Sequence, residues 1–215
     1  MPQSKVTQIL DELKKHYPNS KCSLNYNNPL QLLIATILSA QCTDKRVNLV
    51  TKEIFKKYAE AKDYANTPVE QLEQDIKSTG FYRNKAKNIK ATSQMIINDF
   101  NNQVPDTMDQ LIKLPGVARK TANVVLGNWF HKNEGVVVDT HVSRITQRLN
   151  LTKNKDPNKI EKDLIEIIPK AEWTQFSHYL IDHGRKLCKA PKPNCQDCFF
   201  SEALCPSKQK FLKHN

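Results

Sequence analysis

Glycine is scarce in this sequence, acidic residues are outnumbered by basic ones, and no long apolar run is present. The longest uncharged stretch, residues 23–43, contains asparagine, glutamine and proline and is too polar to span a membrane. The first residues lack the apolar core of a secretion signal. These absences argue against a membrane-embedded or exported protein, and we expect a cytoplasmic protein with no membrane partner.

Only five of the 215 residues are glycine. Glycine is most useful where the backbone turns or where a Cβ does not fit, so we expect each one at a turn or a helix end. The five are Gly80, Gly116, Gly127, Gly135 and Gly184.

The charge of the chain is strongly positive. There are 33 lysine and arginine residues against 22 aspartate and glutamate residues, which gives a formal net charge of +11. Such a surplus favours a polyanionic partner, either nucleic acid or an anionic membrane surface. Because thiols stay reduced in the cytoplasm, we expect the six cysteines to be metal ligands or core residues rather than disulfide partners.

The alternation of polar and apolar residues that is typical of β-strands is absent, and helical periodicity dominates. Leu30, Leu33, Ile34, Ile37 and Leu38 follow the i, i+3, i+4, i+7, i+8 spacing of one buried helix face. Further helices are predicted over 4–17, 44–58, 84–100, 107–113, 119–128, 140–149 and 171–187.

Local signals mark other helix ends and connections. Residues 67–70 read as a capping box with Pro68 at the first helical position, and Asp156 precedes a helix that ends at Pro169. The run 136–138 is too short for a sheet and predicts a buried connector. The tail 208–215 is expected to fray.

Residues 107–128 predict a helix-hairpin-helix motif. A Pro-Gly turn separates a short helix from a second helix that begins at Arg119. Gly116 lets the backbone approach a phosphate closely, and the amides that follow it can donate hydrogen bonds to that phosphate. Leu114, Gly116, Ala118 and Arg119 are therefore candidate DNA contacts.

A lysine and an aspartate near this motif are candidate catalytic groups. Lys120 falls in the first turn of the second helix, and Asp139 follows the run of three valines. An unperturbed lysine titrates near ~10.4, but the helix dipole, desolvation and Arg119 all disfavour its charged form and favour a nucleophilic amine. Asp139 is a good N-cap for the helix after it, and a rigid carboxylate can also move protons. The alternative for Lys120 is simple contact with phosphate or solvent.

Four cysteines cluster near the end of the chain: Cys188, Cys195, Cys198 and Cys205, in the pattern C-x6-C-x2-C-x6-C. Four thiolates can hold a [4Fe–4S] cluster or a zinc ion. Zinc modules usually pair two short knuckles, and only one is present here, so the spacing favours iron and sulfur.

The loop between the first two of these cysteines carries two lysines and two prolines. If both ends of the loop are held by a metal centre, Lys189 and Lys192 are presented at fixed positions. Two cations held in this way suit contact with DNA phosphates.

The segment 114–125, followed by 136–144, closely resembles the endonuclease III family of bacterial DNA base-excision glycosylases with lyase activity. Segments 37–44, 80–86 and 183–185 extend the resemblance over nearly the whole chain. The resemblance implies that Lys120 is the Schiff-base nucleophile and Asp139 the catalytic carboxylate. It also implies a [4Fe–4S] cluster on the four cysteines.

Other positions follow or depart from the family pattern. Gln41 matches the residue that fills the space left by a flipped nucleotide. Phe81 stands where the family usually has a leucine wedge, and Ala118 stands where its hairpin usually has glycine. The last cysteine gap is six residues here and usually five in the family. We expect a bulge or a partial turn to absorb the extra residue.

The implied fold is all-α, with two helical subdomains flanking a DNA-binding cleft. Residues 22–132 form a helical barrel with the hairpin, and residues 1–21 plus 133–215 form a discontinuous subdomain with the cysteine cluster at 188–205. Lys120 and Asp139 are expected to face each other across the cleft.

The implied function is a bifunctional glycosylase and AP lyase, monomeric and associated with the bacterial nucleoid. It would excise oxidised pyrimidines from double-stranded DNA and cut at abasic sites, 3′ to the lesion, by β-elimination. Two alternatives remain. One is a monofunctional glycosylase of the same fold, although such relatives generally lack a lysine at position 120. The other is a non-catalytic helix-hairpin-helix DNA-binding protein stabilised by zinc.

Overall fold

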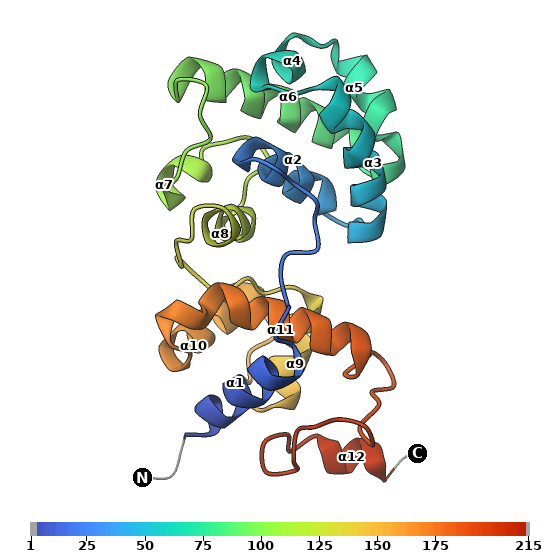
Figure 1. Ribbon diagram of the computed structural model, residues 1–215, viewed down its shortest axis with the longest axis vertical. Helices are drawn as coiled ribbons and strands as arrows, with labels where there is room; N and C mark the ends of the chain where they lie inside the picture. Colours follow the sequence, from blue (N-terminus) through green and yellow to red (C-terminus); the bar gives the residue numbers. More distant parts are fainter. Residues whose placement is uncertain (1–3, 214–215) are drawn as a thin grey trace. The chain divides into compact units, whose positions relative to one another are not determined.

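The computed structural model describes residues 4–213 and divides the chain into two compact units, shown in Figure 1. One unit is Cys22–Lys132, and the other joins Met1–Lys21 to Asn133–Asn215. Within residues 4–213 the regular elements are all helices, with no strand, so the predicted all-α class is confirmed. None of the helices in this part of the chain is long and apolar enough to cross a membrane.

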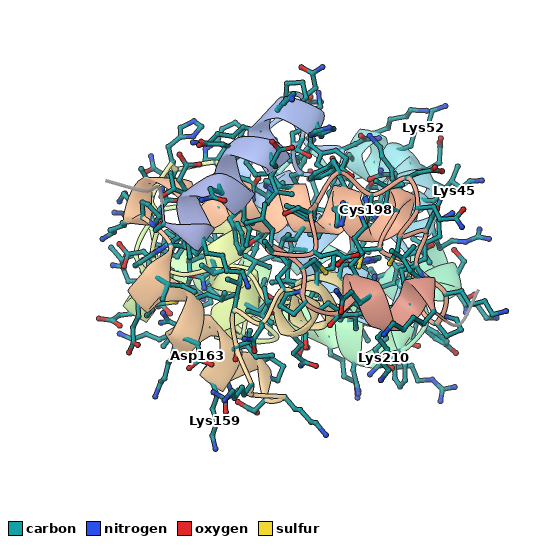
Figure 2. The ribbon with its side chains drawn as sticks, turned by 90° about the horizontal axis from the view of Figure 1, so that it is seen from below. Lys45, Lys52, Lys159, Asp163, Cys198 and Lys210 are labelled. Carbon is teal, nitrogen blue, oxygen red and sulfur yellow. The ribbon has the colours of Figure 1, made fainter. Side chains whose placement is uncertain are left out.

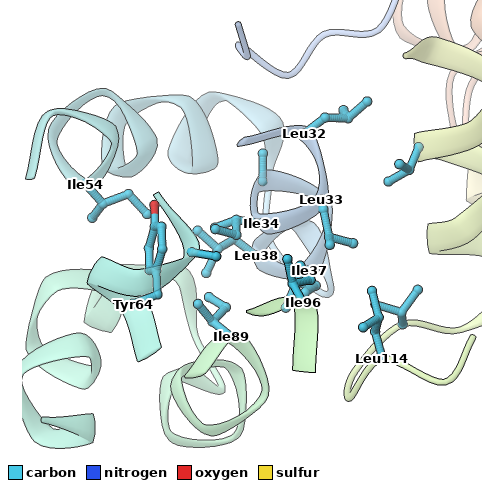
Figure 3. Packing of buried hydrophobic residues seen from close by; sticks show 14 of the residues in the cluster. Leu32, Leu33, Ile34, Ile37, Leu38, Ile54, Tyr64, Ile89, Ile96 and Leu114 are labelled. Carbon is cyan, nitrogen blue, oxygen red and sulfur yellow. The ribbon is translucent and has the colours of Figure 1, made fainter. Parts of the chain in front are cut away.

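The unit Cys22–Lys132 is built around a helix that is buried on all sides in its middle. This helix is α2, and every residue from Leu32 to Leu38 in it is buried. The Asn28 side chain caps it by accepting from the Gln31 N–H at 2.8 Å. Figure 3 shows its leucines and isoleucines packed among side chains of the neighbouring helices. The helices of the unit are α2 (Pro29–Ser39), α3 (Asp44–Lys57), α4 (Ala61–Asn66), α5 (Val69–Ile76), α6 (Tyr82–Asp99), α7 (Met108–Leu111) and α8 (Arg119–Asn128), with a 3-10 turn η1 (Lys77–Thr79).

The second unit has its own core, which combines the two ends of the chain. Ile9, Leu10 and Leu13 of α1 are buried together with residues that lie beyond position 135, such as Phe176 and Leu180. The helices of this unit are α1 (Lys5–His16), α9 (Thr140–Arg148), α10 (Pro157–Ile167), α11 (Trp173–Lys186) and α12 (Lys208–Leu212), with a 3-10 turn η2 (Lys170–Glu172).

Most predicted helices are present, with differences at their ends. The helix predicted after Thr67 begins at Val69, and Pro68 is its N-cap rather than its first helical residue. The Thr67 hydroxyl donates to the Asp63 carbonyl at 2.7 Å and so closes α4 instead of capping α5. Helix α4 was not predicted, because six residues are too few to show a helical period.

The tail predicted to fray contains helix α12 within its described part, because Lys208 fixes the start of that helix. Lys208 Nζ donates to the carbonyls of Cys198 and Phe200, each at 2.8 Å. The Phe211 ring covers the Arg148 guanidinium at 4.6 Å. Residues 214–215 of the same tail lie outside the described residues.

Gly184 lies in the last turn of α11, near the helix end as predicted, and it is buried. A Cβ at this position would lie 2.4 Å from His141 Nδ1 and 3.0 Å from Arg144 Nη2, both on α9. Glycine is therefore needed for the close packing of α9 against α11.

We expect Gly184→Ala to lower the free energy of unfolding by about 1–3 kcal/mol, because the added methyl overpacks the contact between these helices. Denaturant unfolding of this variant is compared with that of Lys162→Ala, a change at an exposed position of α10 in the same unit. Equal stability of the two variants would show that the contact relaxes freely.

Candidate functional site

The hairpin of the helix-hairpin-helix motif is anchored in the core of its unit. Leu114 and Val117 are 2% and 5% exposed, and the Val117 N–H donates to the Leu114 carbonyl at 3.0 Å. Figure 3 shows Leu114 extending from this loop among the core side chains. Only the backbone of Leu114 is therefore available for the predicted DNA contact.

Gly116 fits its place for two reasons. Its φ of +78° lies in the left-handed region, which favours glycine. A Cβ on Gly116 would also lie 2.6 Å from Asn88 Nδ2 of α6. Beside it, Thr92 Oγ1 donates to the Pro115 carbonyl at 2.8 Å. Helix α6 thus supports the hairpin through Asn88 and Thr92, which the motif alone did not identify.

Helix α8 begins directly after the hairpin with the predicted boundaries. Its N-cap, Ala118, provides no side-chain acceptor, and the first amides of a helix have no acceptor within the helix. These amides and the positive end of the helix dipole form a suitable site for an anion. Ala118 and Arg119 are both exposed at this end.

Lys120 is exposed in the first turn of α8. The desolvation that we expected to disfavour its charged form is therefore not found in the structure. Its place at the positive end of the helix and beside Arg119 is as predicted. An exposed amine at this point is accessible to a ligand that binds at the start of α8.

Asp139 is held rigidly at the start of α9. Its Oδ1 accepts from the Val142 N–H at 2.8 Å, so the predicted N-cap role is confirmed. The preceding valines 136–138 are buried in a connector without strand structure, as predicted. The Val137 N–H donates to Ser177 Oγ at 3.1 Å and ties this connector to α11. Lys120 and Asp139 belong to different units, so their approach to each other stays a prediction.

Gln41 and Phe81 lie at the rim of one open pocket with a volume of about 170 Å³. Gln41 follows α2, and Phe81 precedes α6. Both have a positive φ, +52° and +50°, and the Phe81 side chain is 64% exposed. Gly116 of the hairpin lines the same pocket, so three predicted DNA-contact residues from separate parts of the sequence meet here. The other lining residues are Ile37, Ala40, Asn84, Lys85 and Asn88.

The four clustered cysteines line a single small cavity. All four are free thiols, and Cys195 is buried. Figure 2 shows Cys198 within the C-terminal segment, whereas Lys210 of α12 projects outward. In residues 4–213, no group of three or more His, Cys, Asp or Glu side chains is arranged to hold a single metal ion.

The surroundings of these thiols are partly cationic. Arg148 Nη1 lies 3.1 Å from Cys188 Sγ, and Arg148 and Lys208 both line the cavity. Burial raises the pKa of the Cys205 thiol to about 11, and it also raises the pKa values of Cys195 and Cys198. Burial therefore favours the neutral form of these three thiols.

The loop between Cys188 and Cys195 is held by hydrogen bonds to and from its backbone. The Asn194 N–H donates to the Leu187 carbonyl at 2.9 Å, and Arg148 Nη1 donates to the Lys189 carbonyl at 3.0 Å. Lys189 and Lys192 are both exposed on this loop. Arg148 and Lys208 were missed by the sequence reasoning, because nothing in the cysteine spacing points to them.

Comparison with known proteins identifies the family. Residues 34–170 match the HhH-GPD superfamily of base excision DNA repair proteins. The chain is 53% identical over 205 residues to endonuclease III of Synechocystis sp., an alignment that covers 95% of this chain and 93% of the relative.

Two solved structures are similar over almost their whole length. A non-covalent endonuclease III–DNA complex gives a TM-score of 0.92 at 45% identity, covering 99% of this chain and 100% of that one. A trapped endonuclease III–DNA covalent intermediate with an estranged adenine gives 0.90 at 46% identity, covering 98% and 100%. The chain therefore belongs to the endonuclease III family within the HhH-GPD superfamily.

Proposed function

We propose that this chain is a bifunctional DNA glycosylase and AP lyase of base excision repair, acting on oxidised pyrimidines and abasic sites in double-stranded DNA. The observation that carries the proposal is the exposed Lys120 in the first turn of α8, directly after a hairpin suited to hold a phosphate. A similar endonuclease III has been trapped as a covalent intermediate with DNA, which supports amine chemistry in this family.

The proposed reaction begins with the free amine of Lys120. Its Nζ bonds to the sugar C1′ while the bond from C1′ to the base breaks, and the base leaves with a proton. The sugar ring opens and leaves an imine between Nζ and C1′. The imine acidifies the C2′–H, and loss of that proton expels the 3′ oxygen with its phosphate. Water then hydrolyses the imine and releases Lys120.

Asp139 supports this chemistry as a fixed carboxylate. Its cap bond to Val142 fixes the side chain, so little reorganisation is needed when positive charge develops on the sugar. The same group can accept the proton that the attacking amine loses. Gln41 and Phe81 occupy the space left when the damaged nucleotide leaves the stack.

The cavity lined by the four cysteines suits a [4Fe–4S] cluster, which the family implies. Cys188, Cys195, Cys198 and Cys205 would be its ligands, and Arg148 and Lys208 at the same cavity would offset its negative charge. The cluster would act as a structural centre that fixes the loop of Lys189 and Lys192 for contact with phosphate.

We expect Cys205→Ser to lose iron and acid-labile sulfide together with the brown colour of the protein. It should also lower the midpoint of thermal unfolding, because a cluster bound by all four cysteines would hold the segment 188–205 together. Metal analysis and visible absorption measure this, with Cys42→Ser as the control, since Cys42 packs in the other unit. A colourless wild-type protein with bound zinc would instead favour the zinc-stabilised DNA-binding protein.

Duplexes with single defined lesions test the proposed activity. Ring-saturated pyrimidine should be released with a strand cut on its 3′ side, and an undamaged duplex should stay intact. Release of the base without a strand cut would favour the monofunctional alternative. Binding to all duplexes with no turnover on any of them would contradict an enzymatic role.

A further inference from the structure

Lys85 is a lysine buried beside the pocket that Gln41 and Phe81 share. It is 4% exposed, and its Nζ donates to the carbonyls of Leu38 at 2.8 Å and Thr79 at 2.9 Å. Burial lowers the pKa of this ammonium. Burying an ammonium costs free energy, so a buried lysine that bonds to two carbonyls indicates that these bonds have a role in the structure or the function.

The first carbonyl belongs to the end of α2. The last four carbonyls of a helix have no partner within it, and each one here has found another donor. Ser39 Oγ donates to the Thr36 carbonyl, the Ala40 N–H to Ile37, and the Cys42 N–H to Ser39. The Leu38 carbonyl is bonded by Lys85. The loop that contains Gln41 therefore follows a helix end whose last unpaired carbonyl is bonded by Lys85.

The second carbonyl belongs to the end of η1. Thr79 is the last residue of that turn, and Phe81 follows after Gly80. The Lys85 N–H donates to the Phe81 carbonyl at 3.2 Å, while its side chain holds Thr79. Lys85 thus bonds to Phe81 through its backbone N–H and to Thr79, two residues before Phe81, through its side chain.

Gln41 and Phe81 both have a left-handed backbone conformation, which is costly for any residue other than glycine. Gln41 and Phe81 have φ values of +52° and +50°, and each such residue costs roughly 1–2 kcal/mol. These conformations persist only when the surroundings fix them. Lys85 connects the two loops that contain them.

The same face of α6 also holds the hairpin. Lys85, Asn88 and Thr92 follow the i, i+3, i+7 spacing of one helix face. Thr92 donates to Pro115, and Asn88 lies against Gly116. One polar face of α6 therefore contacts all three loops around the pocket.

We infer that Lys85 is a positioning residue that holds Gln41 and Phe81 in the geometry needed to enter the DNA stack. This inference rests on the proposed function, because it assigns Lys85 a part in opening the duplex. Lys85 itself does not touch the reacting atoms. Its loss should weaken insertion of the two side chains while the chemistry at Lys120 remains intact.

The first test measures insertion without turnover. A duplex carries tetrahydrofuran, an unreactive abasic analogue, opposite 2-aminopurine, whose fluorescence reports its unstacking on binding. We expect Lys85→Met to lose most of the fluorescence change seen with wild type at saturating protein. Lys85→Arg, which keeps donors for both carbonyls, should recover part of it.

The chain offers a matched control on the same helix. Lys90 Nζ also donates to two carbonyls, those of Ala65 and Thr67, each at 2.7 Å, and it does not line the pocket. Lys90→Met therefore removes an equivalent pair of bonds elsewhere on α6. An equal loss of fluorescence change in Lys85→Met and Lys90→Met would overturn the inference, because both effects would then be general destabilisation.

The second test is a double-mutant cycle on duplex substrates. We expect Lys85→Met to reduce kcat for base excision by about 10²-fold, as misplaced groups do. In a Gln41→Ala, Phe81→Ala background the same change should have almost no further effect, because Lys85 acts through those residues. Fully additive losses, or a Lys85→Met variant equal to wild type, would overturn the inference.

Failure of the proposed function gives a different pattern. A wild-type protein that unstacks 2-aminopurine but cuts no abasic duplex would refute the lyase, and loss of that unstacking in Lys85→Met but not in Lys90→Met would still support the role of Lys85. A wild-type protein that cuts, with Lys85→Met unchanged in both assays, would refute only the role of Lys85.

Discussion

Lys120→Gln abolishes the covalent adduct that borohydride forms between this protein and an abasic duplex, if Lys120 is the nucleophile. Glutamine keeps a polar side chain that is one atom shorter than that of lysine, but its amide nitrogen is not nucleophilic. Strand cutting should fall by at least about 10³-fold, because no other group replaces a lost nucleophile. Single-turnover cleavage and gel detection of the adduct measure the two effects.

Measuring the DNA affinity of Lys120→Gln distinguishes a loss of chemistry from a loss of binding. The hairpin amides and Gly116 do not depend on the Lys120 side chain, so the affinity for an abasic-analogue duplex should stay within about tenfold. Lys113→Gln is the matched control, since Lys113 is an exposed lysine just before the hairpin. An adduct that persists in Lys120→Gln but disappears in Lys113→Gln would transfer the role to the other lysine.

Asp139→Asn separates the two roles of this carboxylate. Asparagine caps a helix about as well as aspartate, so the stability of α9 should change little. Without the negative charge, base excision should fall by about 10²–10⁴-fold. Thermal unfolding and single-turnover excision, measured on the same preparation, test the pair of outcomes.

Asp139→Ala provides the comparison for the cap. It removes the acceptor of the Val142 N–H and should cost about 1 kcal/mol of stability as well as the activity. If Asp139→Asn retained full excision while Asp139→Ala lost it, the residue would be a helix cap without a part in catalysis.

The motif residues show what could be predicted from the sequence. The boundaries of α8 and the cap at Asp139 follow from local signals, a Pro-Gly turn and an Asp before a helical pattern. Such signals involve residues that are adjacent in the chain, so they can be recognised in a single sequence. Lys85 and Arg148 were missed because the Leu38 carbonyl and the Cys188 sulfur that they contact belong to segments 47 and 40 residues away. Nothing local to either residue indicates these two contacts.

Gly184 and Lys120 show the limits of reading residue types. A glycine near a helix end predicts a backbone role when only its own conformation is considered, but at Gly184 the nearby side chain of His141 also leaves no room for a Cβ. The expected desolvation of Lys120 also depended on surroundings that its neighbours in sequence do not specify. The close packing at Gly184 depends on α9 rather than on α11 itself.

The division of the chain has a consequence for its synthesis on the ribosome. Residues 22–132 form one contiguous unit, whereas α1 packs in a core completed only by segments beyond position 132. During translation, which proceeds from the N-terminus, the middle of the chain can acquire its tertiary structure while Ile9, Leu10 and Leu13 still lack their partners. The apolar face of α1 therefore stays exposed to solvent until the segments beyond position 132 have been synthesised.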